Sequence, residues 1–167
     1  MKDNLIITFD PTKTESAKIE INSRLAEISE KPAISKIEDG LAIMTVKDAK
    51  KAVSQLKKIA IKDKKKFSST YHWIPVDVWC KAKIPDMQKA VKEIQAGIAK
   101  DEKWKMDIGR HKTELHERDM IVKLTEVIDK PNVDLSSPKK ILKVEVVGDK
   151  CAVSLLKPEE YLSVAKL

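Results

Sequence analysis

Short apolar segments with the spacing of β-strands alternate with longer segments of helical spacing, and this order restricts the possible fold more than any other feature. Residues 4–9, NLIITF, form an apolar run that Asp10 and Pro11 stop, which predicts a buried strand. The next four segments are predicted as helix, strand, strand and helix, over residues 14–29, 33–38, 41–46 and from about 48 onward. The order β-α-β-β-α is that of a ferredoxin-like unit without its last strand.

Local signals support this reading. Asp39 and Gly40 stand between the two central strands, and Asp-Gly flanked by apolar segments is a strong signal for a β-hairpin. Lys31 and Pro32 end the first predicted helix. Residues 70–79 supply a final strand, so we expect an N-terminal ferredoxin-like βαββαβ domain over residues 1–80.

The second half of the chain predicts another small α/β unit with its own sheet, over residues 81–167. A helix is expected to begin at Pro85, because apolar residues follow it at helical spacing. The later segments are predicted as strand, helix and two strands, over residues 103–108, 117–129, 141–147 and 151–156. The fold class is therefore mixed, α/β or α+β.

Positive charge is concentrated in one part of the chain. The net charge is +7, and between residues 47 and 66 nine lysines face only two acidic residues. A local field of one sign attracts phosphate groups. A solvated lysine face that serves only solubility is the commoner explanation of such a run, and the composition leaves both explanations open.

Motifs for common catalytic chemistry are absent from the sequence. The chain has four glycines, and it contains no GxGxxG, no GxxxxGK[ST] and no GxSxG. His72, His111 and His116 do not share metal-ligand spacing with each other or with a cysteine. We therefore expect a protein that is not an enzyme and that binds no cofactor and no metal.

The cysteines and the apolar runs indicate a cytoplasmic protein. Cys80 and Cys151 have no CxxC spacing, which argues against a disulfide framework and suggests a reducing compartment. No segment approaches the roughly 18 to 20 apolar residues that span a bilayer. The N-terminal MKDNLIITFDP is apolar only briefly, so it does not have the pattern of a signal peptide.

Two stretches resemble a known family. They are YHWIPVDVWCKAKIPDMQKAVKEI and WKMDIGRHKTELHERDMIVKLTEVIDKPNVDLSSPKKILKVEVVGDKCAVSLLKPEE. Together they resemble the THUMP domain of the small stand-alone archaeal proteins similar to the eukaryotic tRNA acetylation adaptor. The preceding βαββα segment resembles the ferredoxin-like domain that usually precedes THUMP. The resemblance covers nearly the whole chain and assigns residues 81–167 to the THUMP domain.

This resemblance implies an RNA-binding module that grips tRNA while catalysis resides in another protein. The adaptor relatives work with a separate RNA cytidine acetyltransferase that makes N4-acetylcytidine in tRNA. The chain ends soon after its last predicted strand with no fused enzyme domain, so we expect a stand-alone adaptor. Two alternatives stay open: a protein-interaction subunit of another RNA-processing complex without direct RNA contact, and an enzyme of unrecognised type. The tRNA species and the oligomeric state are not predicted.

The candidate RNA-binding residues centre on the turn Gly109-Arg110-His111-Lys112, between a predicted strand and a predicted helix. Free N–H groups at the start of that helix favour a phosphate, and Arg110 can hold one with two hydrogen bonds. Where relatives tend to place small hydroxyl residues before this helix, the chain has Glu114, His116 and Glu117. The full candidate set is Lys64, Lys65, Lys81, Lys83, Lys105, Arg110, His111, Lys112, Arg118, Lys139, Lys140 and Lys157.

The tryptophans are predicted to be structural. Trp73 and Trp79 lie in WIPVDVWCKAK, where they are expected to pack at the joint between the two domains. Trp104 begins a strand and is expected in the core. The alternative is that exposed tryptophans stack on bases.

Overall fold

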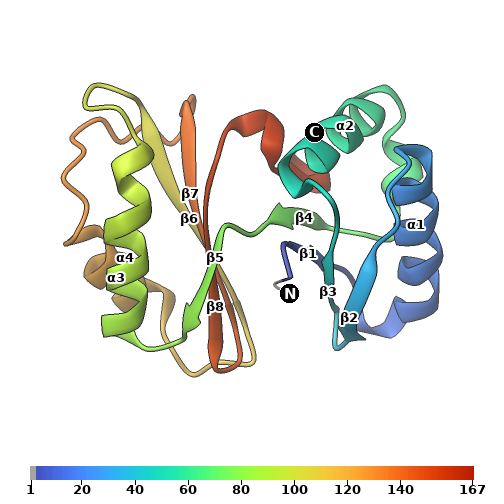
Figure 1. The fold of residues 1–167 in the computed structure, drawn as a ribbon, viewed down its shortest axis with the longest axis horizontal. Coiled ribbons are helices and arrows are strands. Elements are labelled where there is room, and N and C mark those ends of the chain that lie inside the picture. Colours follow the sequence, from blue (N-terminus) through green and yellow to red (C-terminus); the bar gives the residue numbers. More distant parts are fainter. Residues whose placement is uncertain (1–2) are drawn as a thin grey trace. The chain divides into compact units, whose positions relative to one another are not determined.

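The chain forms two compact units in the computed structural model, which describes residues 3–167 (Figure 1). Unit 1 comprises the chain up to Val76 together with Glu159–Leu167, and unit 2 comprises Asp77–Pro158. The predicted division differed in two ways: it lay after residue 80, and it gave the last nine residues to the second domain. The first two residues of the segment considered as a signal peptide lie outside the described part of the chain. No helix within the described residues is long and apolar enough to span a membrane.

Unit 1 is an antiparallel sheet with two α-helices, as the β-α-β-β-α pattern predicted. Its sheet has the strand order β2-β3-β1-β4-β9. The strands are β1 (Leu5–Thr8), β2 (Ala33–Glu38), β3 (Leu41–Thr45), β4 (His72–Pro75) and β9 (Leu162–Ser163). The helices are α1 (Thr14–Glu27) and α2 (Ala49–Lys62), with short 3-10 turns at Pro11–Lys13, Lys64–Phe67, Pro158–Glu160 and Val164–Lys166.

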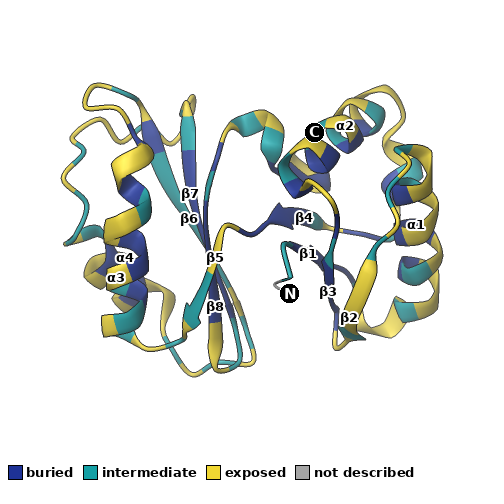
Figure 2. Cartoon of the chain, viewed as in Figure 1, coloured by how far each residue is buried: buried dark blue, intermediate teal, exposed yellow. Residues whose placement is uncertain are grey.

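Local chemistry explains where these elements begin and turn. Asp39 and Gly40 both have positive φ, +54° and +81°, as a tight hairpin between β2 and β3 requires. The Asp48 side chain accepts a hydrogen bond from the Lys51 N–H at 3.1 Å and caps the start of α2. Helices α1 and α2 are buried along one side and exposed along the other, so each contributes one apolar stripe to the core (Figure 2).

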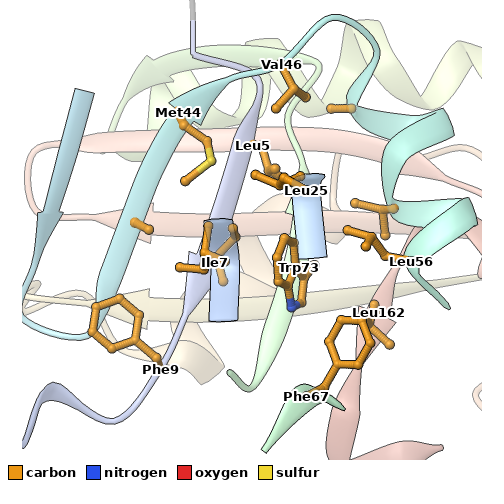
Figure 3. Packing of buried hydrophobic residues seen from close by; sticks show 14 of the residues in the cluster. Leu5, Ile7, Phe9, Leu25, Met44, Val46, Leu56, Phe67, Trp73 and Leu162 are labelled. Carbon is orange, nitrogen blue, oxygen red and sulfur yellow. The ribbon is translucent and has the colours of Figure 1, made fainter. Parts of the chain in front are cut away.

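The core of unit 1 gathers around Trp73 on β4. The Trp73 side chain has 0% exposure, and its Nε1 donates to Thr70 Oγ1 at 2.9 Å. Its ring packs edge-on against the Phe67 ring, with 6.0 Å between the ring centroids. Leu5, Leu56 and Leu162 belong to the same cluster (Figure 3). Trp73 is therefore a core residue of unit 1, and not the joint residue that we predicted.

The predicted strand over residues 70–79 is wrong as a single strand. It is divided into β4, in the sheet of unit 1, and β5 (Val78–Lys81), in the sheet of unit 2. Asp77 lies between them: its N–H donates to Ser154 Oγ at 3.2 Å, and its carboxylate accepts from the Leu155 N–H at 2.9 Å. Apolar and polar residues alternate across this break, from Val76 to Val78, so this alternation could not show where one strand ends and the next begins.

Unit 2 is a four-stranded mixed sheet with the order β5-β8-β7-β6. Its other strands are β6 (Trp104–His111), β7 (Lys140–Val147) and β8 (Lys150–Leu156), and its helices are α3 (Ile84–Ile94) and α4 (Glu117–Thr125), with a 3-10 turn at Gln95–Gly97. β6 and β7 are parallel and α4 lies in the connection between them, while the other pairs are antiparallel. Both helices lie on the same side of this sheet (Figure 1), where Leu142, Val144 and Met87 help to form a second core.

Candidate nucleic-acid interface

Cationic side chains gather where β5, β6 and β7 end. These three strands run in the same direction, so their carboxyl ends meet at one edge of the unit 2 sheet. The pairing register places Lys81, Lys150, Val147 and His111 in one row across the four strands. We call this region the basic edge, defined by Lys81, Lys83, Arg110, His111, Lys112 and Lys150.

Backbone hydrogen bonds hold the basic edge together. The Ala82 N–H donates to the Asp149 carbonyl at 2.9 Å, and the Gly148 N–H donates to the His111 carbonyl at 2.8 Å. The β7–β8 hairpin is therefore tied both to the end of β5 and to the end of β6. Gly148 has φ +62°, which this short hairpin needs.

The last two residues of β6 are Arg110 and His111, which the sequence placed in a turn, and this end of the strand presents Arg110 at the surface. Its Nη1 donates to the Leu115 carbonyl at 2.9 Å, which links the guanidinium to the loop that leads into α4. Arg110 is exposed, and a guanidinium has further N–H donors for a phosphate. Lys112 has φ +53°, so this lysine occupies a left-handed position in the turn.

A buried group of charges lies next to the basic edge, on the side chains that alternate away from the two helices. His111 Nε2 is 3.5 Å from Glu145 Oε1, and Lys143 Nζ is 3.5 Å from Glu145 Oε2 and 3.4 Å from Asp107 Oδ1. Lys143 and Glu145 are 4% and 3% exposed. Lys143 therefore contacts two carboxylates, and His111 Nε2 lies beside one of them.

Gly109 makes room for this charge group. Gly109 is the register partner of Glu145, and a Cβ at position 109 would overlap the Glu145 carboxylate. No side chain larger than hydrogen fits there without a shift of Glu145. The glycine of the predicted turn thus serves packing on β6, and it lies within the strand and not in the turn.

The start of α4 suits a phosphate less well than the sequence predicted. Arg118 is exposed in the first turn, but Glu117 and Asp119 occupy that turn as well. His116 precedes the helix and its side chain makes no capping hydrogen bond. Two carboxylates offset the attraction of the helix dipole for an anion, so the basic edge as defined above does not include Arg118. Arg118 lines a shallow hollow with Glu117, Ile121 and Val122.

Four other candidate residues lie toward the opposite edge of the same sheet. They are Lys105, Lys139, Lys140 and Lys157. Strands of eight residues separate the two edges by about 25 Å. Lys140 Nζ contacts Glu102 Oε1 at 3.1 Å, and the Ala99 N–H and Lys140 together lower the pKa of Glu102. Acidic groups therefore offset part of the positive charge at this edge.

Lys64 and Lys65 belong to unit 1. They are exposed in the 3-10 turn that follows α2, and neighbouring Lys66 contacts Glu27 at 2.7 Å. The Arg24 Nη1 donates to the Lys66 carbonyl at 2.9 Å and fixes this turn on α1. The lysine run therefore forms a basic surface of unit 1, and contacts with Arg24 and Glu27 hold it against α1.

Lys150 is a member of the basic edge that sequence reasoning missed. Residues 141–147 and 151–156 were predicted as consecutive strands, and the residues between two such strands lie at the edge where the first strand ends and the second begins. The signal was thus present, but only the pairing of β8 with β5 brings Lys150 opposite Lys81.

The remaining tryptophans lie in unit 2. Trp104 is buried, as predicted, and its Nε1 donates to the Lys130 carbonyl at 3.1 Å. Trp79 is half-buried on β5 and pairs in register with Ala152. Within the described residues, no group of three or more His, Cys, Asp or Glu side chains is arranged to hold a metal ion.

Solved structures share this fold, although no family model and no curated protein matches the sequence. PH1313 from Pyrococcus horikoshii Ot3 aligns with a TM-score of 0.61 and 16% identity, over 93% of this chain and 55% of that protein. TrmN from Thermus thermophilus aligns with a TM-score of 0.57 and 12% identity, over 92% of this chain and 45% of that protein. The chain thus spans about half the length of these proteins. The mixed α/β fold that the sequence predicted is therefore shared with these two proteins.

Proposed function

We propose that the chain is a THUMP-type module that binds tRNA and presents it to a separate modification enzyme, an RNA cytidine acetyltransferase that makes N4-acetylcytidine. The observation that carries the proposal is the basic edge of unit 2. The resemblance of the second half of the chain to the THUMP domain and the fold shared with PH1313 and TrmN support it. In this proposal the chain contributes binding and positioning and performs no chemistry itself.

The basic edge has the properties that a phosphate backbone needs. Lys81, Lys83, Arg110, Lys112 and Lys150 are all exposed, and they come from three connected strand ends. Asp149 is the acidic residue in the hairpin between them. Contacts between cations and phosphates release counterions, so binding becomes weaker as salt rises. If three to five phosphates are neutralised, the slope of log K against log salt is about −2 to −5.

The test compares two variants with equal loss of charge in unit 2. One variant carries Lys81→Gln, Arg110→Gln and Lys150→Gln at the basic edge, and the other carries Lys103→Gln, Lys139→Gln and Lys157→Gln at the opposite edge. All six side chains are exposed. Both proteins and the parent are titrated with tRNA over a range of salt concentrations. We expect the basic-edge variant to bind more weakly and to lose about 2 to 3 units of salt slope, at 0.7 to 0.9 per contact.

The opposite-edge variant is expected to keep most of the parental affinity. Equal losses in the two variants would show that net charge matters and the basic edge does not. A further variant with Lys64→Gln and Lys65→Gln tests the basic surface of unit 1. A loss of binding in that variant alone would move the tRNA site to unit 1. No binding of tRNA by the parent at low salt would refute the proposed function.

A further inference from the structure

The two cysteines of the chain are direct neighbours across a strand pair. Cys80 on β5 and Cys151 on β8 are register partners, although 70 residues separate them in the sequence. Both side chains contact the apolar core of unit 2, and the Cys151 thiol donates to the Ala152 carbonyl at 3.8 Å. The two thiols are free in this structure. Sequence spacing gave no sign of this pairing, because CxxC was the pattern considered.

The backbone geometry at this pair is compatible with a disulfide. The Ala82 N–H donates to the Asp149 carbonyl two residues along, so Cys80 and Cys151 are also at a hydrogen-bonded position of the ladder. Such partners have Cα atoms about 5.5 Å apart, within the range of about 4.4 to 6.8 Å seen in disulfides. Their Cβ atoms are usually up to about 5.5 Å apart, above the roughly 3.8 Å that a disulfide prefers. Closure therefore requires a small approach of the two strands.

β5 is the strand that can make this approach. It is four residues long and lies at an edge of the sheet, so it has a single ladder partner, β8. A disulfide that draws two strands together is strained, and strained disulfides are easily reduced again. The geometry thus favours a reversible bond over a permanent one.

The two thiols differ in accessibility and in acidity. Cys80 is half-buried and Cys151 is fully buried. The adjacent Cys151 thiol holds the pKa of Cys80 below its ordinary value, and the neighbouring Cys80 sulfur together with burial raises the pKa of Cys151. A small oxidant is therefore expected to react first with the Cys80 thiol, and Cys151 is the adjacent thiol that can react next.

We propose that Cys80 and Cys151 form a reversible disulfide between β5 and β8 when the protein meets a peroxide. The Cys80 sulfur attacks one oxygen of hydrogen peroxide, the O–O bond breaks, and Cys80 becomes a sulfenic acid as water leaves. The Cys151 sulfur then attacks the Cys80 sulfur, the S–O bond breaks, and a second water leaves with the Cys151 proton. Two thiols are oxidised and one peroxide is reduced to two waters. A dithiol reductant reverses the reaction.

Peptide mass spectrometry tests this proposal on the full chain. The protein is treated with hydrogen peroxide, digested without reduction and compared with an untreated sample. We expect a cross-linked peptide that contains Cys80 and Cys151 and lacks two hydrogen atoms, in a protein that stays monomeric on a non-reducing gel. Dithiothreitol should restore both free thiols. Disulfide-linked dimers as the main product would overturn the proposal.

Single variants separate the two roles. In Cys151→Ala, Cys80 has no partner, so its sulfenic acid should persist and react with dimedone. In Cys80→Ala, the buried Cys151 should resist the same treatment. Free thiols in the treated parent, under conditions that oxidise Cys80 in Cys151→Ala, would also refute the pairing. The parent experiment stands by itself if either variant fails to fold, and none of these results depends on tRNA binding.

Discussion

At the scale of single residues, Gly109 is the position where one added methyl group should disturb unit 2 most directly. A Cβ there would overlap the Glu145 carboxylate, which is buried with Lys143. We expect Gly109→Ala to destabilise the protein by about 1 to 3 kcal/mol, the usual cost of overpacking. Chemical denaturation measures this loss. An unchanged midpoint would mean that Glu145 has another position that it can adopt at no cost.

Trp73 should matter for stability and not for RNA. Its indole is fully buried in unit 1 and donates to Thr70. Trp73→Ala is expected to cost about 3 to 5 kcal/mol, as for other large aromatic residues removed from a core. The matched control is Trp79→Ala, where the side chain is half-buried and the loss should be smaller. Urea titrations of both variants test the order; a larger loss for Trp79→Ala would contradict it.

At the scale of elements, β9 closes the sheet of unit 1 with only two residues. Leu162 is fully buried and pairs in register with Trp73. The Val164 N–H donates to the Tyr71 carbonyl at 2.9 Å, and the Tyr161 ring stacks on the His72 ring with 6.3 Å between the ring centroids. We expect Leu162→Ala to cost about 2 to 5 kcal/mol. Because the two units have separate cores, the loss should fall on unit 1.

Hydrogen exchange distinguishes the two units in that variant. Amides of β1, β3 and β4 should lose protection, whereas amides of β7 and β8 should exchange as in the parent. Equal loss of protection in both sheets would show that the units unfold together. A charge-neutral control is Ala165→Ser, since Ala165 is exposed in the same terminal segment.

The elements also show how far the sequence could lead. Both helices of unit 1 and the Asp39-Gly40 hairpin were predicted near their observed bounds, because caps, turn residues and apolar period agreed there. β9 was missed because two residues cannot display a period. Unit 2 was predicted in outline, but its strand order was not, and strand order alone brings Lys81, Lys150 and His111 into one row. The sequence therefore identified candidate site residues one by one, but it could not show which of them lie together in the folded protein.

At the scale of the whole molecule, the adaptor proposal predicts that the purified protein alone leaves tRNA unmodified. The sequence contains no recognisable motif for a nucleotide, an acetyl donor or a methyl donor. Incubation with tRNA and acetyl-CoA, then with S-adenosylmethionine, followed by mass spectrometry of nucleosides, should show no new product. Acetylcytidine formed without a second protein would refute the adaptor role. The positive control adds an RNA cytidine acetyltransferase to the same mixture, and acetylcytidine is then expected.

The return of residues 159–167 to unit 1 has a consequence for how the protein is made. A ribosome delivers β1 to β4 first, but their sheet receives β9 only after all 82 residues from Asp77 to Pro158 have been translated. At about 5 to 20 residues per second, that interval is roughly 4 to 16 seconds. During this time the nascent chain carries β4 with an open edge, whereas the inserted unit 2 can fold as soon as its own residues emerge. The later half of the polypeptide is thus the first to have all its strands.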